Sequence, residues 1–176
     1  MTSFHPGFLL LVGLAGTNAG AEVLSNSIWA RAAARAQVSV ETLYAIALQE
    51  SGLRWPDHRI RPWPWTLNSP AGPMRFAGKA EAQAEFEKLR RAGQTNIDIG
   101  MMGINWAAHG RRYARLDLFD PATNLAVSAK ILAGTKKATP DLALAIGHYH
   151  SPQHGRALEY ALRVERWARA IGHHAG

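Results

Sequence analysis

We expect the rest of the chain to pack around residues 43–53, Leu43-Tyr44-Ala45-Ile46-Ala47-Leu48-Gln49-Glu50-Ser51-Gly52-Leu53, because this segment combines a core helix with a carboxylate. At helical period, one face holds the residues at i, i+3, i+4 and i+7, which are Leu43, Ile46, Ala47 and Glu50. Packing this face would remove water from Glu50, and burial raises the pKa of a carboxyl. A carboxyl that stays protonated near neutral pH can act as a general acid. The same spacing also fits a Glu50 that extends into solvent near the helix end, and periodicity alone favours that alternative.

The composition indicates one domain with a sizeable core and an anionic partner. The chain has 176 residues, of which 47% are hydrophobic, and we expect residues 22–176 to form a single domain. A net charge of +7 favours nucleic acid, a membrane surface or an acidic polymer as partner. The arginines are scattered and form no basic run, which argues against nucleic acid. The absence of cysteine excludes disulfides, cysteine–zinc sites and thiol nucleophiles.

The first 21 residues have features of a signal peptide. The apolar run from Phe8 to Ala15 is followed by Ala19-Gly20-Ala21, which has the small-x-small form of a signal-peptidase site. The run is too short to span a bilayer as a mature helix. No Lys or Arg precedes it, so the basic n-region is missing. We therefore expect residues 1–21 to be a signal peptide and the mature protein to be periplasmic; a buried N-terminal segment is the alternative.

Periodicity and capping residues predict a predominantly α-helical α+β domain. Six helices are expected, at residues 25–37 (capped by Ser25 or Asn26), 40–52 (capped by Ser39), 79–92, 120–132, 139–151 (opened by Thr139-Pro140) and 155–171. One stripe of the fifth helix holds Leu142, Ile146 and Tyr149, and the last helix carries Tyr160, Val164, Trp167 and Ile171 inward. Between the second and third helices, residues 55–76 contain five prolines and predict a hairpin or a long loop.

Two sets of side chains in these segments leave alternatives open. Trp55, Trp63 and Trp65 could stack on sugar rings beside a cleft, or could form a small satellite core under the insert. The histidines at 148, 150 and 154 could suggest a metal site, but residues at i and i+2 point to different sides of a helix. We therefore expect neither a metal nor a cofactor.

Three segments, in order, resemble motifs of one family. Ala47–Leu53 resembles the catalytic Glu-Ser motif of the soluble lytic transglycosylases, which belong to the lysozyme-like superfamily. Residues 100–105, Gly-Met-Met-Gly-Ile-Asn, resemble the family's Gly-Leu-Met-Gln-Ile motif, and residues 145–151 resemble its Ala-x-x-Tyr-Asn segment. The helix that contains Asn124 matches the segment between these two. The resemblance covers about residues 25–170, and the Pro-Trp-Pro-Trp-Thr insert and Tyr-His-Ser-Pro resemble the subgroup that accompanies conjugation, secretion and pilus systems.

The resemblance implies a lysozyme-like fold and a set of functional residues. Glu50 would be the general acid that cleaves the bond between N-acetylmuramic acid and N-acetylglucosamine in peptidoglycan. The reaction would be that of a lyase, which consumes no water and forms 1,6-anhydromuramic acid, and Tyr149 would donate its hydroxyl to Glu50. Ser51 would contact substrate or fix the loop after the helix. The remaining expected substrate-binding residues, which would line the sugar site, are Gly100, Met101, Met102, Gly103, Ile104, Asn105 and His150. Expected partners are glycan strands and components of a conjugative, secretion or pilus machine.

The sequence departs from the family pattern at two of these positions. Gly103 replaces the motif glutamine, which removes an amide from the sugar site, and His150 replaces the asparagine. Two other functions therefore remain open: a binding module with weakened catalysis, and a lysozyme-type hydrolase. The hydrolase would require a second carboxylate, Asp98 or Asp57, about 6.5–9.5 Å from Glu50 across a cleft.

Overall fold

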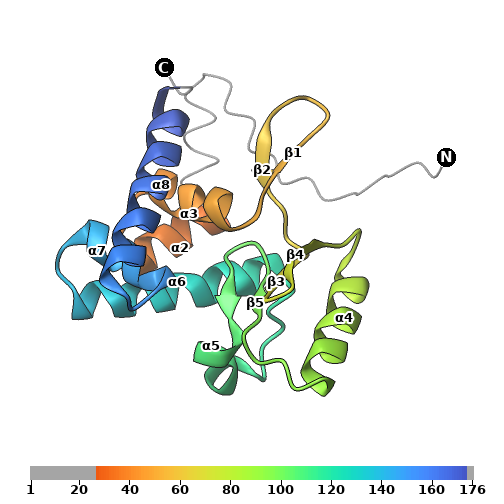
Figure 1. Ribbon diagram of the computed structural model, residues 1–176. Helices are drawn as coiled ribbons and strands as arrows, with labels where there is room; N and C mark the ends of the chain where they lie inside the picture. The colour runs from red at the N-terminus through yellow and green to blue at the C-terminus, as the bar shows by residue number, and fades with distance from the viewer. Residues whose placement is uncertain (1–26, 174–176) are drawn as a thin grey trace.

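The computed structural model describes residues 27–173 of the chain (Figure 1). Its helices are α2 (Ile28–Ala36), α3 (Val40–Ser51), α4 (Lys79–Arg91), α5 (Trp106–Tyr113), α6 (Pro121–Ala138), α7 (Leu142–His150) and α8 (His154–His173). Its strands are β1 (Gly52–Arg54), β2 (Ile60–Pro62), β3 (Thr66–Ser69), β4 (Gly72–Arg75), β5 (Asp98–Ile99) and β6 (Ile104–Asn105). The predicted α+β class with a helical majority is confirmed, whereas the predicted signal peptide lies outside the described residues.

Helix α3 begins and ends where its local sequence predicts. The Ser39 hydroxyl accepts a hydrogen bond from the backbone N–H of Thr42, and Gly52 follows the last helical residue. At α2 the prediction of the cap was wrong, because Ser27 accepts the bond from Ala30 N–H. The residues expected to cap this helix, Ser25 and Asn26, lie outside the described part of the chain.

The strands form two small antiparallel sheets. Strands β1 and β2 pair as a hairpin directly after α3, and the second sheet has the order β4-β3-β5-β6. Of the two alternatives predicted for residues 55–76, a hairpin or a long loop, the structure has the hairpin: β3 pairs with β4, with Thr66 opposite Arg75. Strand β3 also pairs with β5, so the hairpin lies beside the turn that joins β5 to β6. The sheet therefore brings residues 66–75 next to residues 98–105.

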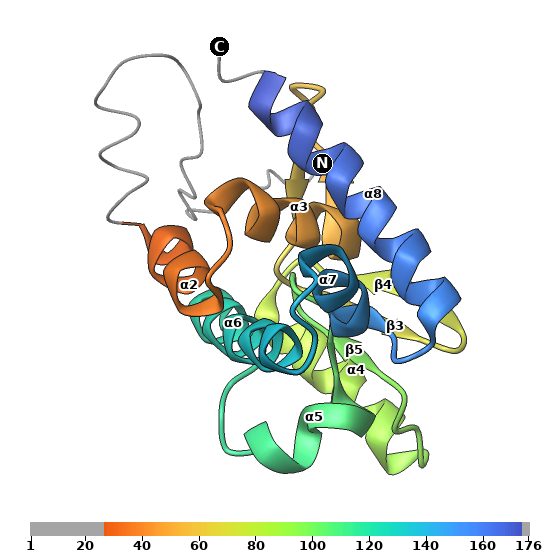
Figure 2. The ribbon, with the colours of Figure 1, turned by 90° about the vertical axis from the view of Figure 1, so that its left-hand side faces the viewer.

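Two hydrophobic cores lie on either side of that turn. The first packs α2, α3, α6, α7 and α8 together, and Figure 2 shows these helices crossing one another beside the sheet. The second packs the sheet against α4 and α5. Helix α6 contributes to both, with Leu125 in the first core and Val127 in the second. The β5–β6 turn also joins them, because Met102 lies in the first core and Ile104 in the second.

Three helix predictions are corrected by the structure. Helix α5 was not predicted, although Trp106 and Tyr113 lie at i and i+7 and the Asn105 side chain caps it by accepting from Ala108 N–H. Helix α6 continues to Ala138, so Thr139 ends it instead of opening the next helix. The cap of α7 is Asp141, and Leu142 is therefore its first residue and 44% exposed, not part of a buried stripe.

Among residues 27–173, no helix has both the length and the apolar character that a bilayer span requires.

Candidate functional site

Glu50 lies in the last turn of α3, where the helix meets the β5–β6 turn and the β3–β4 hairpin. A cleft of about 260 Å³ opens there, and its lining includes Glu50, Thr66, Arg75, Asp98 and Gly103. Only 14% of the Glu50 side chain is exposed. The alternative in which this carboxylate extends into solvent is therefore wrong. Packing of α3 against α8 and the β5–β6 turn places the carboxyl at the floor of the cleft.

Burial sets the protonation of Glu50. Desolvation raises its pKa from 4.5 to about 7, because the charged form loses water. The hydrogen bond from Tyr160 lowers the pKa, the charge of Asp98 raises it, and that of Arg163 lowers it, but each effect is smaller than desolvation. Near neutral pH a large fraction of the carboxyl therefore carries a proton, as a general acid requires.

Tyr160 holds the carboxyl of Glu50 in position. Its hydroxyl donates to Glu50 Oε1 at 2.5 Å, and its ring is buried between α3 and α8. Burial and the neighbouring Glu50 raise the pKa of Tyr160 well above its usual value, so the phenol keeps its proton. The sequence predicted Tyr160 only as an inward-facing residue of the last helix.

The prediction that Tyr149 donates to Glu50 is wrong. The Tyr149 hydroxyl donates to the backbone carbonyl of Met102 at 2.6 Å, and this carbonyl belongs to the β5–β6 turn. Tyr149 therefore does not bond to Glu50 itself; it bonds to the β5–β6 turn, against which the Glu50 carboxyl lies. The reason is tertiary: α8 crosses α3 next to Glu50, and α7 does not reach it with this side chain.

His150 flanks the same carboxylate oxygen. Its ring stacks on that of Tyr160, with centroids 4.5 Å apart and an interplanar angle of 4°, and its Nδ1 lies 3.9 Å from Glu50 Oε1. Desolvation lowers the pKa of His150. The ring is therefore mostly neutral at pH 7, and the contact is not an ion pair there. The His150 side chain is 42% exposed, but it is not among the residues that line the cleft, so its predicted substrate contact would have to be made beside the cleft.

The second carboxylate oxygen, Oε2, lies against Gly103. An ideal Cβ at residue 103 would be only 2.4 Å from Oε2, and the backbone of Gly103 has φ +59°. Both facts favour glycine, since a side chain would occupy the place of the carboxyl and the left-handed backbone is unfavourable for other residues. Oε1 is thus held by Tyr160, and Oε2 lies beside Gly103, which has no side chain to displace it.

The motif methionines and isoleucine do not form a sugar-binding wall. Met101, Met102 and Ile104 are each at most 1% exposed and belong to the two cores. The prediction of direct substrate contact is therefore wrong for these three side chains. Glycines at both ends of the turn let the methionines fold inward, away from the cleft.

Ser51 and Asn124 are buried hydrogen-bonding residues that fix the turn. The Ser51 hydroxyl donates to the carbonyl of Met101 and accepts from Trp63 N–H, so of the two predicted roles it fixes the loop. The Asn124 amide donates to the carbonyls of Ile99 and Leu118 and accepts from Met102 N–H. A Cβ at Gly100 would collide with Asn124, so Gly100 allows this close approach.

Of two polar residues on β5 and β6, Asp98 lines the cleft and Asn105 does not. Asn105 donates to Asn96 and Asp98 and caps α5, so its predicted substrate contact would have to compete with these bonds. Asp98 lines the cleft with Glu50 and also accepts from Asn68. Asp57, the other carboxylate considered from the sequence, is outside the cleft lining and pairs with Arg61 on the β1–β2 hairpin.

The three tryptophans of the insert form a ladder. Ring centroids are 5.7 Å apart between Trp55 and Trp63 and 5.6 Å apart between Trp63 and Trp65. Trp63 Nε1 donates to the carbonyl of Phe76, and Trp65 packs on the second core. None of the three lines the cleft, so the geometry favours the satellite core over a sugar-stacking platform.

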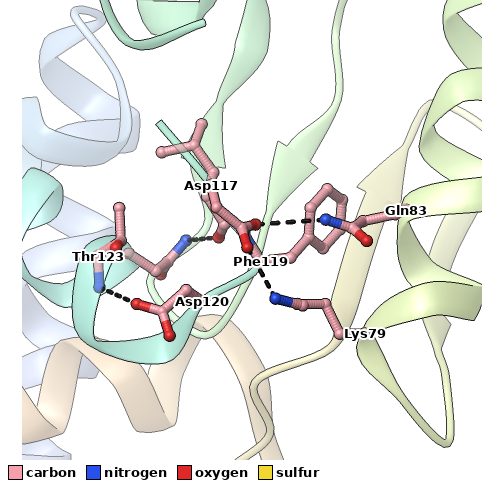
Figure 3. Close-up of polar contacts among 8 residues, drawn as sticks. Lys79, Gln83, Asp117, Phe119, Asp120 and Thr123 are labelled. Atoms are coloured by element: carbon pink, nitrogen blue, oxygen red, sulfur yellow. Dashed lines mark hydrogen bonds and ion pairs between the residues drawn. The ribbon is translucent and has the colours of Figure 1, made fainter. Parts of the chain in front are cut away.

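A second pocket of about 500 Å³ lies between α4 and residues 114–119. Asp117 on its rim accepts hydrogen bonds from Lys79 Nζ at 2.8 Å and from Phe119 N–H at 3.0 Å, and Gln83 approaches it from α4 (Figure 3). Burial would raise the pKa of Asp117, but the bond from Lys79 and those from backbone N–H groups outweigh it and lower the pKa. This carboxylate is ionised and joins α4 to the loop before α6.

Within residues 27–173 no group of three or more His, Asp and Glu side chains is arranged to hold a metal ion. Comparisons with family models, with curated proteins and with solved structures found no match to this chain. The geometry of the Glu50 cleft therefore carries the functional conclusion.

Proposed function

We propose that this chain is a peptidoglycan lytic transglycosylase. The observation that carries the proposal is a single carboxyl, Glu50, with its pKa raised to about 7, one oxygen held by Tyr160 and the other beside Gly103 in a cleft. Further support comes from the motif resemblance and from the net charge of +7, which suits a polymer whose peptide stems carry carboxylates.

One carboxyl is sufficient for the proposed reaction. Glu50 donates its proton to the oxygen that bridges N-acetylmuramic acid and N-acetylglucosamine, and the C1–O bond breaks. The 2-acetamido group of the substrate stabilises the oxocarbenium-like centre at C1. The ionised Glu50 then accepts the proton of the C6 hydroxyl, whose oxygen bonds to C1 and closes a 1,6-anhydro ring. The carboxyl regains its proton, and no water is consumed.

The surroundings of Glu50 suit both halves of this cycle. A pKa near 7 makes the proton available in the first half without making the carboxylate too weak a base for the second. Tyr160 donates to Oε1 in either protonation state, so the carboxyl keeps its orientation while its charge changes. Oε2, beside Gly103, is the oxygen left free to exchange the proton with the substrate.

A lysozyme-type hydrolase is the second candidate, because Asp98 lines the same cleft as Glu50. Hydrolysis by inversion would use Asp98 as the base that activates water. The two reactions give different products, since a reducing end contains one water more than an anhydro end. Association with an envelope-spanning conjugation, secretion or pilus machine is part of the proposal through the subgroup resemblance alone.

Mass spectrometry of digested sacculi tests the proposal. Wild-type protein should release 1,6-anhydro-muropeptides, and Glu50→Gln should slow release by about 10²–10⁴-fold. Asp98→Asn should leave the anhydro product and change the rate only a few-fold. Products with reducing ends, together with loss of activity in Asp98→Asn, would instead establish the hydrolase. Equal clearing by wild type and Glu50→Gln would contradict both enzymes and support a binding module.

A further inference from the structure

Arg75 is the one cation among the described residues that line the cleft; the lining also contains the carboxyls of Glu50 and Asp98. It is the last residue of β4, directly after the half-buried Met74, which packs on the second core. Alternation along the strand therefore turns the Arg75 side chain away from that core. Its position is defined by the hairpin register and not by a flexible loop.

One strand pairing places the Arg75 backbone, and one hydrogen bond places its guanidinium. Across the hairpin Arg75 pairs with Thr66, whose hydroxyl donates to the carbonyl of Gly100 at the start of the β5–β6 turn. Arg75 Nη2 donates to the carbonyl of Gly52 at 3.2 Å, and Gly52 follows Glu50 by two residues. The guanidinium is thus held between the hairpin and the end of α3, at the wall of the cleft.

This guanidinium is poised for a further partner. No carboxylate among residues 27–173 lies within ion-pair distance of Arg75, and its side chain is exposed. Its bond to Gly52 uses one Nη donor, which leaves N–H groups in the forked geometry that matches a carboxylate.

We infer that Arg75 is a specificity-determining residue that binds a carboxylate on the muramic acid substituent of the substrate. The inference rests on the proposed function and names the part of the polymer that the cleft recognises. N-acetylglucosamine has no carboxylate. Muramic acid has a lactyl group whose carboxyl is either free or extended by a peptide stem with carboxylates of its own. Arg75 would therefore distinguish peptidoglycan from chitin and set which sugar lies on which side of Glu50.

Equilibrium binding in the Glu50→Gln background tests this inference, because the strands then stay intact. Three ligands of equal length are compared: stem-bearing glycan strands, strands stripped by an amidase so that the lactyl carboxylate is free, and a chitooligosaccharide. Adding Arg75→Gln should weaken binding of muramic-acid strands on the order of ten-fold and leave the chitooligosaccharide unchanged. Loss confined to stripped strands assigns the lactyl carboxylate, and loss confined to stem-bearing strands assigns the stem.

Arg54→Gln is the matched control. Arg54 is also an exposed arginine with one bond to a backbone carbonyl, that of His58 at 3.1 Å, but it is outside the cleft lining. It should change none of the three affinities. Arg75→Lys, which keeps the charge and loses the fork, should weaken binding less than Arg75→Gln. With Glu50 restored, Arg75→Gln should raise KM for peptidoglycan at unchanged kcat, which a purely structural role would not do.

Equal weakening for all three ligands, or none for any, would overturn the inference while leaving the transglycosylase proposal to its own product test. Failure of the Glu50→Gln protein to bind either kind of muramic-acid strand would overturn both.

Discussion

Two pockets of this molecule contain a carboxyl in opposite electrostatic settings. Glu50 lies in the cleft beside α3, loses water to its neighbours and has no ion-pair partner at neutral pH, so its pKa rises to about 7. Asp117 lies on the rim of the pocket beside α4, where Lys79 and backbone N–H groups lower its pKa. Glu50 is therefore a carboxyl that can donate a proton near neutral pH, whereas Asp117 is an ionised carboxylate that links α4 to the loop before α6. Stability should therefore respond to pH in opposite directions at the two positions.

Glu50→Gln should have the largest effect on stability, and that effect should depend on pH. Because the folded state raises the pKa of Glu50 from 4.5 to about 7, the contribution of this carboxyl to stability is fully present below pH 4.5 and is lost as the pH rises through about 7. Glutamine can still accept the bond from Tyr160. The variant should match wild type near pH 4 and exceed it by about 3 kcal/mol near pH 8. Urea unfolding at both pH values measures the difference, and an equal change at the two would contradict the raised pKa.

Gly103→Ala should lower the free energy of unfolding by about 1–3 kcal/mol, because the new methyl group would collide with Glu50 Oε2 and the backbone at residue 103 is left-handed. Release of muropeptides should fall more than the loss of stability alone explains, since the carboxyl must move. Gly93→Ala provides the control: Gly93 has φ +82° and nothing within 4 Å of its Cβ position. Thermal unfolding of both variants separates backbone strain from crowding, and equal losses would show that Gly103 does not crowd Glu50.

Tyr160→Phe should cost about 1 kcal/mol by removing one hydrogen bond, and so should Tyr149→Phe. Only the first should change the pH profile. The bond from Tyr160 lowers the pKa of Glu50, so its removal should shift the alkaline limb of kcat/KM to higher pH. Tyr149 bonds to the Met102 carbonyl and should leave that limb in place. A shifted alkaline limb in Tyr149→Phe, with none in Tyr160→Phe, would instead show that Tyr149 positions the Glu50 carboxyl.

Asp117→Asn should have the smallest effect. Its pairing with Lys79 is exposed, and such pairs add little to stability. The pKa of Asp117 is lowered, so whatever the ionised carboxyl contributes is present at neutral pH and lost as pH falls through its folded pKa. A small decrease in melting temperature at pH 7 should therefore shrink as the pH falls below 3.8, the ordinary pKa of an aspartate, with muropeptide release unchanged. A variant that is less active but equally stable would place this pocket in the function.

Sequence patterns alone were sufficient to predict the parts of the structure that depend on neighbouring residues. Ser39 and Gly52 mark the ends of α3 through bonds within a few residues, and proline placement predicted a hairpin or a long loop at residues 55–76. The stripe through Leu43 and Ile46 predicted helix α3 and the face that packs in the core, but not the burial of Glu50. These features are local, so periodicity and capping chemistry are sufficient to predict them.

Which distant groups meet Glu50 depends on how the helices pack against one another. Tyr149 and Tyr160 both lie on apolar stripes, and their spacing does not say which phenol reaches a carboxyl in another helix; the crossing of α8 over α3 selects Tyr160. The same packing buries Met101 and Met102 and raises the pKa of Glu50. The desolvation of Glu50 comes from every element packed around its carboxyl, so the raised pKa cannot be predicted from one short segment of the sequence.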